Sequence, residues 1–263
     1  MRVIRFTPKP GSELGNDPLF GIIEEDDHTV SVINGDPLFN GITKNGQITK
    51  LEEIRLLAPV LPRSKVVCVG KNYSDHAKEM GGEVPAEPII FLKPNTSVAG
   101  PNDVIHWPWM SERVDHEAEL AIVIGRICKD VPRERASEVI FGYTIGNDIT
   151  ARDLQMRDGQ WARAKSFDTF KPLGPWIETD FDIEKATLTT TVNGNVVQND
   201  KLTNMIFDLP EIIHHITQVM TLLPGDVILT GTPHGIGPLP EKSSVTVSIT
   251  GIGELTNKVS GRG

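Results

Sequence analysis

From residue 65 onward the chain repeats one pattern, in which a short run rich in β-branched and other apolar residues is followed by a loop. Such runs predict β-strands. They are KVVCVG, PIIFLKP, ELAIVIG, FGYTIGND, TLTTTVNG, DVILTGTP and SVTVSIT. The 24 glycines and 19 prolines add frequent turns and leave room for few helices. The sequence therefore predicts a β-rich, mixed α/β fold.

One segment has clear helical spacing. Asp208 is a good N-cap and Pro210 would fall in the first turn. The apolar residues then recur at helical intervals: Ile212, Ile213, Ile216, Val219 and Met220. We expect this helix to end before Pro224.

The first 60 residues or so read as a small module of short strands: MRVIRF, LFGIIEE, TVSVI and an ITKLEEIRLLAPV segment. Asn34-Gly35 and Asn45-Gly46 are signals for hairpin turns. The Pro-containing stretch at residues 57–62 interrupts the pattern before the next strand. We therefore expect a small N-terminal α/β domain over residues 1–62 and a second domain over residues 63–263.

Charge and hydropathy exclude several partners. The net charge is -9, and no Lys/Arg block could follow a phosphate backbone or an anionic membrane surface, so no nucleic-acid or membrane partner is expected. The N-terminus lacks the apolar segment of a signal peptide, and no apolar run is long enough for a membrane span. We expect a cytoplasmic protein. Cys68 and Cys128 lie in apolar stretches without CxxC spacing and should be buried thiols.

Glu117 and Glu119 precede and begin an apolar strand. Residues two apart on a strand face the same side, so both carboxylates would project together. Like charges held so close need a cation or a proton between them, and oxygen-only ligands suit Mg²⁺, Mn²⁺ or Ca²⁺. The alternative is two solvent-facing glutamates at the end of a strand.

Asp148 follows another apolar strand. If a helix begins there, Asp148, Arg152 and Gln155 at i, i+4 and i+7 would share one face. Such a group can combine a metal ligand with side chains that hold a substrate carboxylate. An N-capping Asp with an ordinary i,i+4 ion pair is the competing interpretation.

His76 and Glu79 would meet on one helical turn, where the carboxylate fixes the imidazole tautomer and the dyad can activate a water. An inert surface histidine is the alternative. Lys165 lies among small and aromatic neighbours, where a poorly solvated ammonium can stabilise an enolate or oxyanion, although most lysines are solvated.

The loop at Gly231 and Thr232 follows an apolar strand. Its backbone amides and the Thr232 hydroxyl could cradle an oxyanion, and a plain glycine turn is the alternative. The chain has no Walker A motif, no GxGxxG after a strand and no GxSxG elbow. Nucleotide binding and serine-hydrolase chemistry are therefore not indicated.

Six ordered motifs together resemble the fumarylacetoacetate hydrolase family over about residues 65–260. The motifs are VCVGKNYSDHAKEM, PIIFLKPNTSVAGPND, VDHEAELAIVIG, GYTIGNDITARDLQ, AKSFDTFKPLGPW and GDVILTGTPHGIGP. Within that family the chain is most similar to the acylpyruvate hydrolase and oxaloacetate decarboxylase branch, with 2-hydroxyhepta-2,4-diene-1,7-dioate isomerases as near relatives.

The resemblance implies a β-sandwich or β-roll C-terminal domain, a homodimer, and Mg²⁺ or Mn²⁺ held by Glu117, Glu119 and Asp148. By motif match it makes His76 and Glu79 an acid–base dyad and Lys165 a further catalytic group. The implied substrate contacts are Lys71, Arg152, Gln155, Gly231 and Thr232. Some relatives carry Arg in place of Lys71, which would replace a bidentate grip on a carboxylate with a point charge here.

The predicted function is metal-dependent cleavage of a carbon–carbon bond in a small 2-oxo acid. Decarboxylation of oxaloacetate to pyruvate and CO2 is the preferred reaction, and acylpyruvate hydrolysis is a possible second activity. A 2-hydroxyhepta-2,4-diene-1,7-dioate isomerase is the alternative, and a noncatalytic binding protein is a third interpretation. The segments at residues 79–88 and 107–112 are candidates for a lid.

Overall fold

A computed structural model describes residues 1–79, 81 and 83–262. The first half of the chain contains strands β1 (Arg2–Pro8), β2 (Leu19–Ile23), β3 (Thr29–Ile33), β4 (Lys44–Lys50), β5 (Ile54–Leu56), β6 (Val66–Gly70), β7 (Ile89–Lys93), β8 (Val98–Ala99), β9 (Val104–Ile105), β10 (Val114–His116) and β11 (Ala118–Ile124). The second half contains β12 (Ile140–Asn147), β13 (Thr150–Ala151), β14 (Lys171–Glu178), β15 (Thr187–Val192), β16 (Asn195–Lys201), β17 (Val227–Leu229), β18 (Gly237–Pro238), β19 (Ser244–Ile249) and β20 (Gly253–Val259). The expected strand-rich, mixed α/β fold is confirmed.

Helices are few and short. The α-helices are α1 (Pro37–Asn40), α2 (Ser74–Glu79), α3 (Arg152–Asp158), α4 (Ala162–Lys165) and α5 (Leu209–Val219). The 3-10 helices are η1 (Leu51–Glu53), η2 (Asn95–Ser97), η3 (Arg133–Val139), η4 (Ile183–Lys185) and η5 (Leu202–Asn204). No helix in the described residues is long and apolar enough to cross a bilayer.

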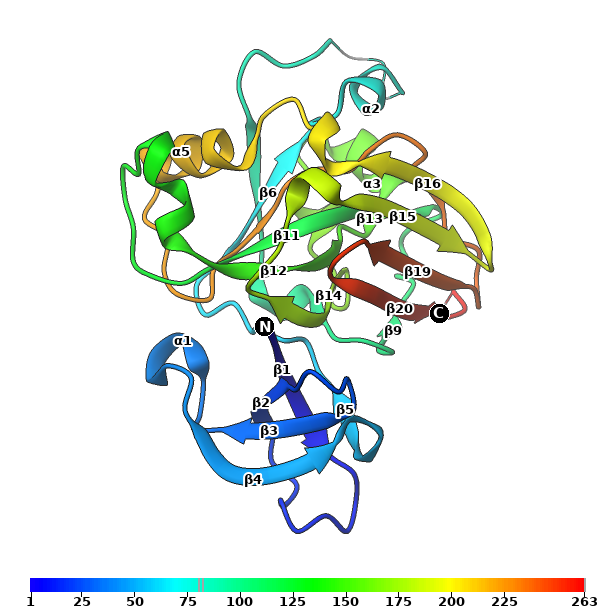
Figure 1. Ribbon diagram of the computed structural model, residues 1–263. Coiled ribbons are helices and arrows are strands. Elements are labelled where there is room, and N and C mark those ends of the chain that lie inside the picture. Colours follow the sequence, from blue (N-terminus) through cyan, green and yellow to red (C-terminus); the bar gives the residue numbers. More distant parts are fainter. Residues whose placement is uncertain (80, 82, 263) are drawn as a thin grey trace.

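The largest sheet contains strands from the N-terminal segment and from the rest of the chain. Its strand order is β4-β3-β2-β1-β14-β12-β11-β17-β6-β7 over the described residues, and β5 and β8 pair with β1 and β14. The N-terminal strands form a lobe of their own (blue in Figure 1) but share this sheet through the antiparallel pairing of β1 with β14. The predicted boundary at residues 62 and 63 falls between β5 and β6, and the division into two domains stays a prediction.

A second sheet, ordered β16-β15-β19-β20-β9, packs against the central strands of the first (Figure 1). The layer between them is apolar because alternate residues of the strands turn inward. Leu120, Ile122 and Ile124 of β11 meet Leu188 of β15 and Val247 of β19 there. This packing fixes the position of β11, the strand that carries the candidate metal ligands.

The predicted helix is confirmed as α5, which packs against this apolar layer, although Val219 at its end is 59% exposed. Asp208 accepts a hydrogen bond from the Glu211 amide at 2.8 Å, and Ile212, Ile213 and Ile216 are buried. The predicted buried thiols are also present, since Cys68 and Cys128 are both free and buried.

Both predicted hairpin turns in the N-terminal lobe are wrong. A ten-residue connection that includes α1 joins β3 to β4, with Asn34-Gly35 at its start. Asn45-Gly46 lies inside β4, next to a shift in the β3–β4 register, with Gly46 at φ 90. Glycine at positive φ within a strand is typical of a β-bulge. An Asn-Gly pair can therefore mark a bulge as well as a hairpin turn.

Candidate metal centre and substrate pocket

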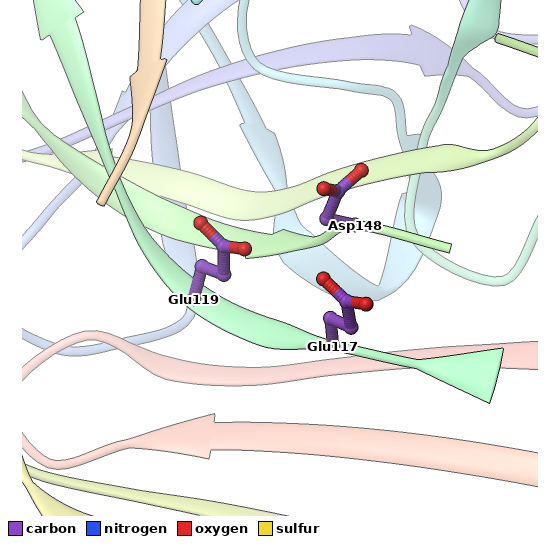
Figure 2. Close-up of side chains that lie close together, drawn as sticks. All are labelled: Glu117, Glu119 and Asp148. Atoms are coloured by element: carbon purple, nitrogen blue, oxygen red, sulfur yellow. The ribbon is translucent and has the colours of Figure 1, made fainter. Parts of the chain in front are cut away.

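Three carboxylates meet where two neighbouring strands end (Figure 2). Glu117 immediately precedes β11, Glu119 is its second residue, and Asp148 directly follows β12. The β11–β12 register sets Ala118 opposite Asn147, so the ends of the two strands lie side by side. One oxygen from each acid lies within 4.8 Å of the others.

All three acids are buried, which contradicts the interpretation of Glu117 and Glu119 as solvent-facing glutamates. Burial and the nearby charges of Asp148 and Glu117 raise the pKa of Glu119 well above its ordinary range. Burial acts on Glu117 and Asp148 in the same direction, but the nearby cations outweigh it and lower the pKa of both. Basic side chains thus compensate the charges of Glu117 and Asp148, but they do not compensate that of Glu119 to the same extent.

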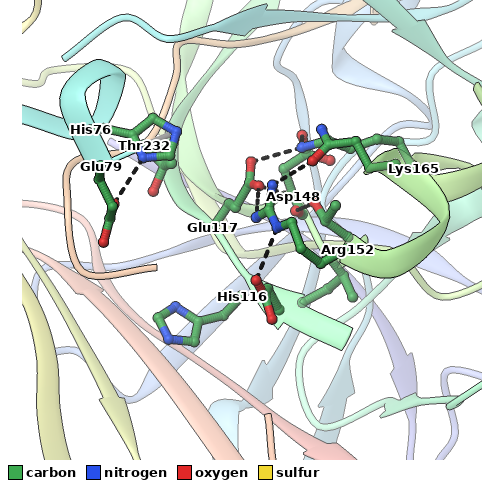
Figure 3. Close-up of polar contacts among 12 residues, drawn as sticks. His76, Glu79, His116, Glu117, Asp148, Arg152, Lys165 and Thr232 are labelled. Carbon is green, nitrogen blue, oxygen red and sulfur yellow. Dashed lines mark hydrogen bonds and ion pairs between the residues drawn. The ribbon is translucent and has the colours of Figure 1, made fainter. Parts of the chain in front are cut away.

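Three basic side chains contact Glu117 or Asp148, and Figure 3 labels two of them, Arg152 and Lys165. The Lys165 ammonium donates to Glu117 Oε2 and Asp148 Oδ2, both at 2.7 Å. Arg152 pairs with Glu117, and Lys93 pairs with the other carboxylate oxygen of Asp148, Oδ1. Burial opposes the charge on Lys165, but the two carboxylates outweigh it and raise the pKa of this lysine.

The predicted helix through Asp148, Arg152 and Gln155 is wrong. Helix α3 begins only at Arg152, because residues 150–151 form β13, and Ala151 stands at the N-cap. Asp148 therefore neither caps a helix nor pairs with Arg152. Arg152 donates to Gln155 Oε1 at 2.6 Å and to Asp115 Oδ2 at 2.9 Å. The three residues still line one pocket, although no helix face joins them.

His76 and Glu79 lie on helix α2 in the expected contact. His76 Nδ1 is 3.1 Å from Glu79 Oε2, and His76 is 5% exposed (Figure 3). The other oxygen of Glu79 accepts a hydrogen bond from the Gly235 amide at 3.1 Å. The dyad is thereby tied to the loop after β17.

That loop reaches the acids through Gly231, whose amide donates to Glu119 Oε2 at 2.6 Å. The Gly231 amide is therefore bound to a carboxylate of the protein, which fits neither a free oxyanion cradle nor a plain glycine turn, the two interpretations of this loop. Gly231 has φ 97, and a Cβ at this position would lie 2.6 Å from the Cβ of Asn72, so the glycine permits the close approach. Thr232 follows it and lines the pocket.

The pocket has a volume of about 190 Å³ and is lined by both charged and apolar side chains. Two of the apolar ones, Phe91 and Trp161, contact each other with their rings 5.1 Å apart and edge to face. Lys71 lies at the rim in a left-handed backbone conformation (φ 56). A cavity of this size suits a small molecule only.

Residues 79–88 and 107–112 were the two segments predicted to form a lid. Met80 and Gly82, within residues 79–88, lie outside the described residues. In residues 107–112, Trp107 packs against a buried cluster and donates to Ser111 O at 2.9 Å, whereas Trp109 is 72% exposed. Among the described residues, none from this second segment lines the pocket.

Several residues at the site were missed from the sequence. Lys93 and Asp115 are fully or almost fully buried and anchor Asp148 and Arg152, and Asn147 accepts from the Glu117 amide at 3.0 Å. Asp115 has a detectable signal, because it continues the two-residue spacing of Glu117 and Glu119. Lys93 has none, because one lysine at the end of a strand is ordinary.

Comparison with known proteins places this site in a family. Residues 65–260 match the fumarylacetoacetate (FAA) hydrolase C-terminal family, and residues 1–59 match the Rv2993c-like N-terminal family. The chain belongs to the fumarylacetoacetate hydrolase family. The resemblance found in the sequence motifs is thereby confirmed.

Three relatives show how varied the reactions of this family are. The chain is 48% identical to 2-hydroxyhepta-2,4-diene-1,7-dioate isomerase from Mycobacterium marinum, with a TM-score of 0.89 over 100% of this chain and 99% of that one. It is 43% identical to the human mitochondrial oxaloacetate tautomerase FAHD2A over 79% of this chain and 70% of the relative. It is 32% identical to fumarylpyruvate hydrolase from Pseudomonas aeruginosa, solved with Mn²⁺ and pyruvate, with a TM-score of 0.73 over 79% and 92% of the two chains.

The acid cluster fits the divalent metal of this family. Glu117, Glu119 and Asp148 offer only carboxylate oxygens, the donors that Mg²⁺ and Mn²⁺ prefer. Burial and the like charges of Asp148 and Glu117 raise the pKa of Glu119, and a cation among the three acids would relieve that repulsion. These three side chains are the residues that would hold the ion.

Proposed function

We propose that this protein is a Mg²⁺- or Mn²⁺-dependent enzyme that forms and stabilises the enolate of a small 2-oxo acid, working as a cytoplasmic homodimer. One observation carries the proposal: a buried three-carboxylate cluster shares a small pocket with Lys165 and His76. The cation would supply Lewis-acid stabilisation of negative charge on substrate oxygens. The proposed substrate contacts are Lys71, Arg152, Gln155, Gly231 and Thr232.

The first reaction we propose is decarboxylation of oxaloacetate. The bond between C3 and C4 breaks, CO2 leaves, and the electron pair forms the enolate of pyruvate. Lys165 is buried, and its ammonium can stabilise charge that develops on the enolate oxygen. A proton is then added at C3, which gives pyruvate. This route needs no attacking water.

Acylpyruvate hydrolysis is the proposed second activity of the same pocket. Here His76, held by Glu79, removes a proton from water, and the resulting hydroxide attacks the acyl carbonyl. The bond to the pyruvate C3 then breaks and the enolate leaves. The dyad is therefore required for hydrolysis but not for decarboxylation.

A second candidate is proton relocation, as in an isomerase or tautomerase. It uses the same enolate, and the buried His76 can move the proton without a water. The names of two relatives, an isomerase and an oxaloacetate tautomerase, support this candidate.

Assays of the Mn²⁺-loaded protein with oxaloacetate, acetylpyruvate and 2-hydroxyhepta-2,4-diene-1,7-dioate separate these reactions. Pyruvate release from oxaloacetate supports cleavage. Isomerisation of the dienedioate, or tautomerisation of oxaloacetate without pyruvate, would favour proton relocation instead. Inactivity toward all three, with Mn²⁺ bound, would reject the proposal.

The division of labour has its own test in Glu79→Gln. We expect acylpyruvate hydrolysis to fall by about 100-fold or more, since the amide no longer supports a charged imidazole, while decarboxylation changes by less than about 10-fold. Asp75→Asn, an exposed acid on the same helix, is the matched control. Equal losses in both reactions would contradict the separate role of the dyad.

A further inference from the structure

The side chain of Gln198 points inward from a strand that is otherwise exposed. On β16 the neighbours Val197 and Asn199 face solvent, and Val196 is 62% exposed, whereas Gln198 is 2% exposed. A buried amide must satisfy both its donors and its acceptor. The hydrogen bonds of this side chain therefore explain why a polar group can be buried there.

The orientation of the Gln198 amide follows from two backbone groups. Its Oε1 faces the Ala118 N–H at 3.4 Å, and a backbone N–H can only donate. Its Nε2 faces the Pro233 carbonyl at 2.9 Å, and a carbonyl can only accept. Exchanging oxygen and nitrogen would break both hydrogen bonds. Oε1 also receives the Thr190 hydroxyl at 2.9 Å, a third contact that fits the same orientation.

This orientation determines what Thr232 can do. Gln198 Nε2 lies 2.9 Å from Thr232 Oγ1, and because the amide nitrogen only donates, the hydroxyl oxygen accepts there. The hydroxyl hydrogen of Thr232 must then point elsewhere. Within the described part of the chain, Oγ1 has no other side-chain hydrogen-bond partner, and Thr232 lines the pocket.

We propose that Gln198 is a positioning residue that holds the Thr232 hydroxyl as a hydrogen-bond donor to an anionic oxygen of the substrate. The inference rests on the proposed function, because it takes the pocket to bind a 2-oxo acid. Gln198 also holds the loop itself through Pro233, between the points where Gly231 binds Glu119 and Gly235 binds Glu79.

Two variants separate the donor from the rest of the side chain. Gln198→Met keeps the length but removes every polar contact. Gln198→Glu keeps an oxygen for Ala118 and Thr190, and its second oxygen would accept the Thr232 hydrogen and turn it away from the substrate. We expect each to lower kcat/KM by about 10- to 100-fold, the usual effect of one hydrogen bond to a charged group. Asn199→Ala, the exposed amide next in the strand, should change it by less than about 3-fold.

A double-mutant cycle with Thr232→Val gives the decisive readout. If Gln198 acts mainly through the Thr232 hydroxyl, the loss in Gln198→Met/Thr232→Val is much smaller than the product of the two single losses, with the Pro233 contact accounting for any remainder. If the two losses multiply, or if Gln198→Met and Gln198→Glu fold and retain full kcat/KM, the proposal is overturned.

The same cycle is read in the dissociation constant of pyruvate, measured by calorimetry on Mn²⁺-loaded protein. Non-additive weakening of pyruvate binding supports the inference even if none of the assayed substrates is turned over, so its failure and that of the proposed reaction are distinguishable. Additive weakening would reject it. Far-ultraviolet circular dichroism identifies any variant that has not folded, and the other variant then completes the cycle.

Discussion

The three central acids receive unequal compensation from the protein. Lys165 and Arg152 contact Glu117, and Lys165 and Lys93 contact Asp148. Among the described residues, only the Gly231 amide donates a hydrogen bond to Glu119, and burial with two like charges raises the pKa of this acid. Glu119 is therefore the acid with most to gain from a bound cation.

Replacing Glu119 with Gln should weaken Mn²⁺ binding by more than about 100-fold, because loss of a residue that merely supports a ligand already costs about 10- to 100-fold. The affinity is measured by titration calorimetry or from the electron paramagnetic resonance spectrum of free Mn²⁺. Glu254→Gln, at an exposed position, should leave it unchanged. Normal Mn²⁺ affinity in Glu119→Gln would show that the ion, if any, binds elsewhere.

Another buried lysine, Lys171, lies near Lys93 and Asp148. Lys171 is fully buried, and its ammonium donates a hydrogen bond to Cys68 Sγ at 3.5 Å. Burial lowers the pKa of Lys171 to about 8, and the nearby Lys93 acts in the same direction. Below pH 8 the unfolded chain therefore binds this proton more readily than the folded chain does, which disfavours folding.

Lys171→Met should accordingly raise the free energy of unfolding by about 3 kcal/mol at pH 7, because each tenfold loss of proton affinity on folding costs about 1.4 kcal/mol. The difference from the wild type should shrink as pH rises from 8 toward 10, because the unfolded lysine then also loses its proton. Chemical denaturation at several pH values measures this, with Lys201→Met at an exposed position as the control. A difference that is independent of pH would contradict it.

Several strands were not expected from the sequence, among them the short β8, β9, β10, β13 and β18 and the longer β14, β16 and β20. The reasons differ for β14 and β16. Strand β14 contains Pro172 and Pro175, residues that lack a backbone donor and are unfavourable inside a sheet. Strand β16 is largely polar and exposed, so it shows no strong apolar pattern. Both are strands because of their neighbours, and that information is tertiary rather than local.

Helix α5, by contrast, was predictable because its start carries local chemistry. Asp208→Ala should cost about 1 kcal/mol through loss of the cap to Glu211, and lower the melting temperature by about 2–4 °C. Turnover should be unchanged, since α5 does not line the pocket. Asp208→Asn, which can still cap, should restore most of the stability. If Asp208→Ala melts with the wild type, the cap contributes nothing measurable.

Within the described residues, one strand pairing, β1 with β14, joins the N-terminal lobe to the rest of the chain. Val3 of β1 lies opposite Ile177 of β14, and both are buried, as are Ala58 and Val60 in the same cluster. Removing residues 1–62 would leave the edge of β14 unpaired and expose this cluster. Unpaired apolar edges promote association between chains.

We therefore expect the chain truncated at residue 62 to melt at a lower temperature and to self-associate, as measured by calorimetry and light scattering. Ile48→Thr, at a 66% exposed position of the N-terminal lobe, should do neither. A monodisperse truncated protein with unchanged melting temperature would show that the C-terminal part is independently stable.

The sequence predicted the site better than it predicted the connections. Glu117 and Glu119 could be assigned to one face because strand periodicity is local, and the ordered motifs brought Asp148, His76 and Lys165 to the same place. The contacts of Lys93 with Asp148, of Asp115 with Arg152 and of Gln198 with Thr232 could not be predicted, because each joins residues more than 30 positions apart in the sequence. The pairing of β1 with β14 could not be predicted for the same reason.

The acid cluster and three other pocket residues are positioned by different kinds of structure. Glu117, Glu119 and Asp148 stand where β11 and β12 pair, so the strand ladder sets their spacing. Lys71, Trp161 and Thr232 lie in connections between strands or helices. Loop sequences can therefore diverge during evolution and admit new substrates while the ion-binding apparatus is inherited unchanged.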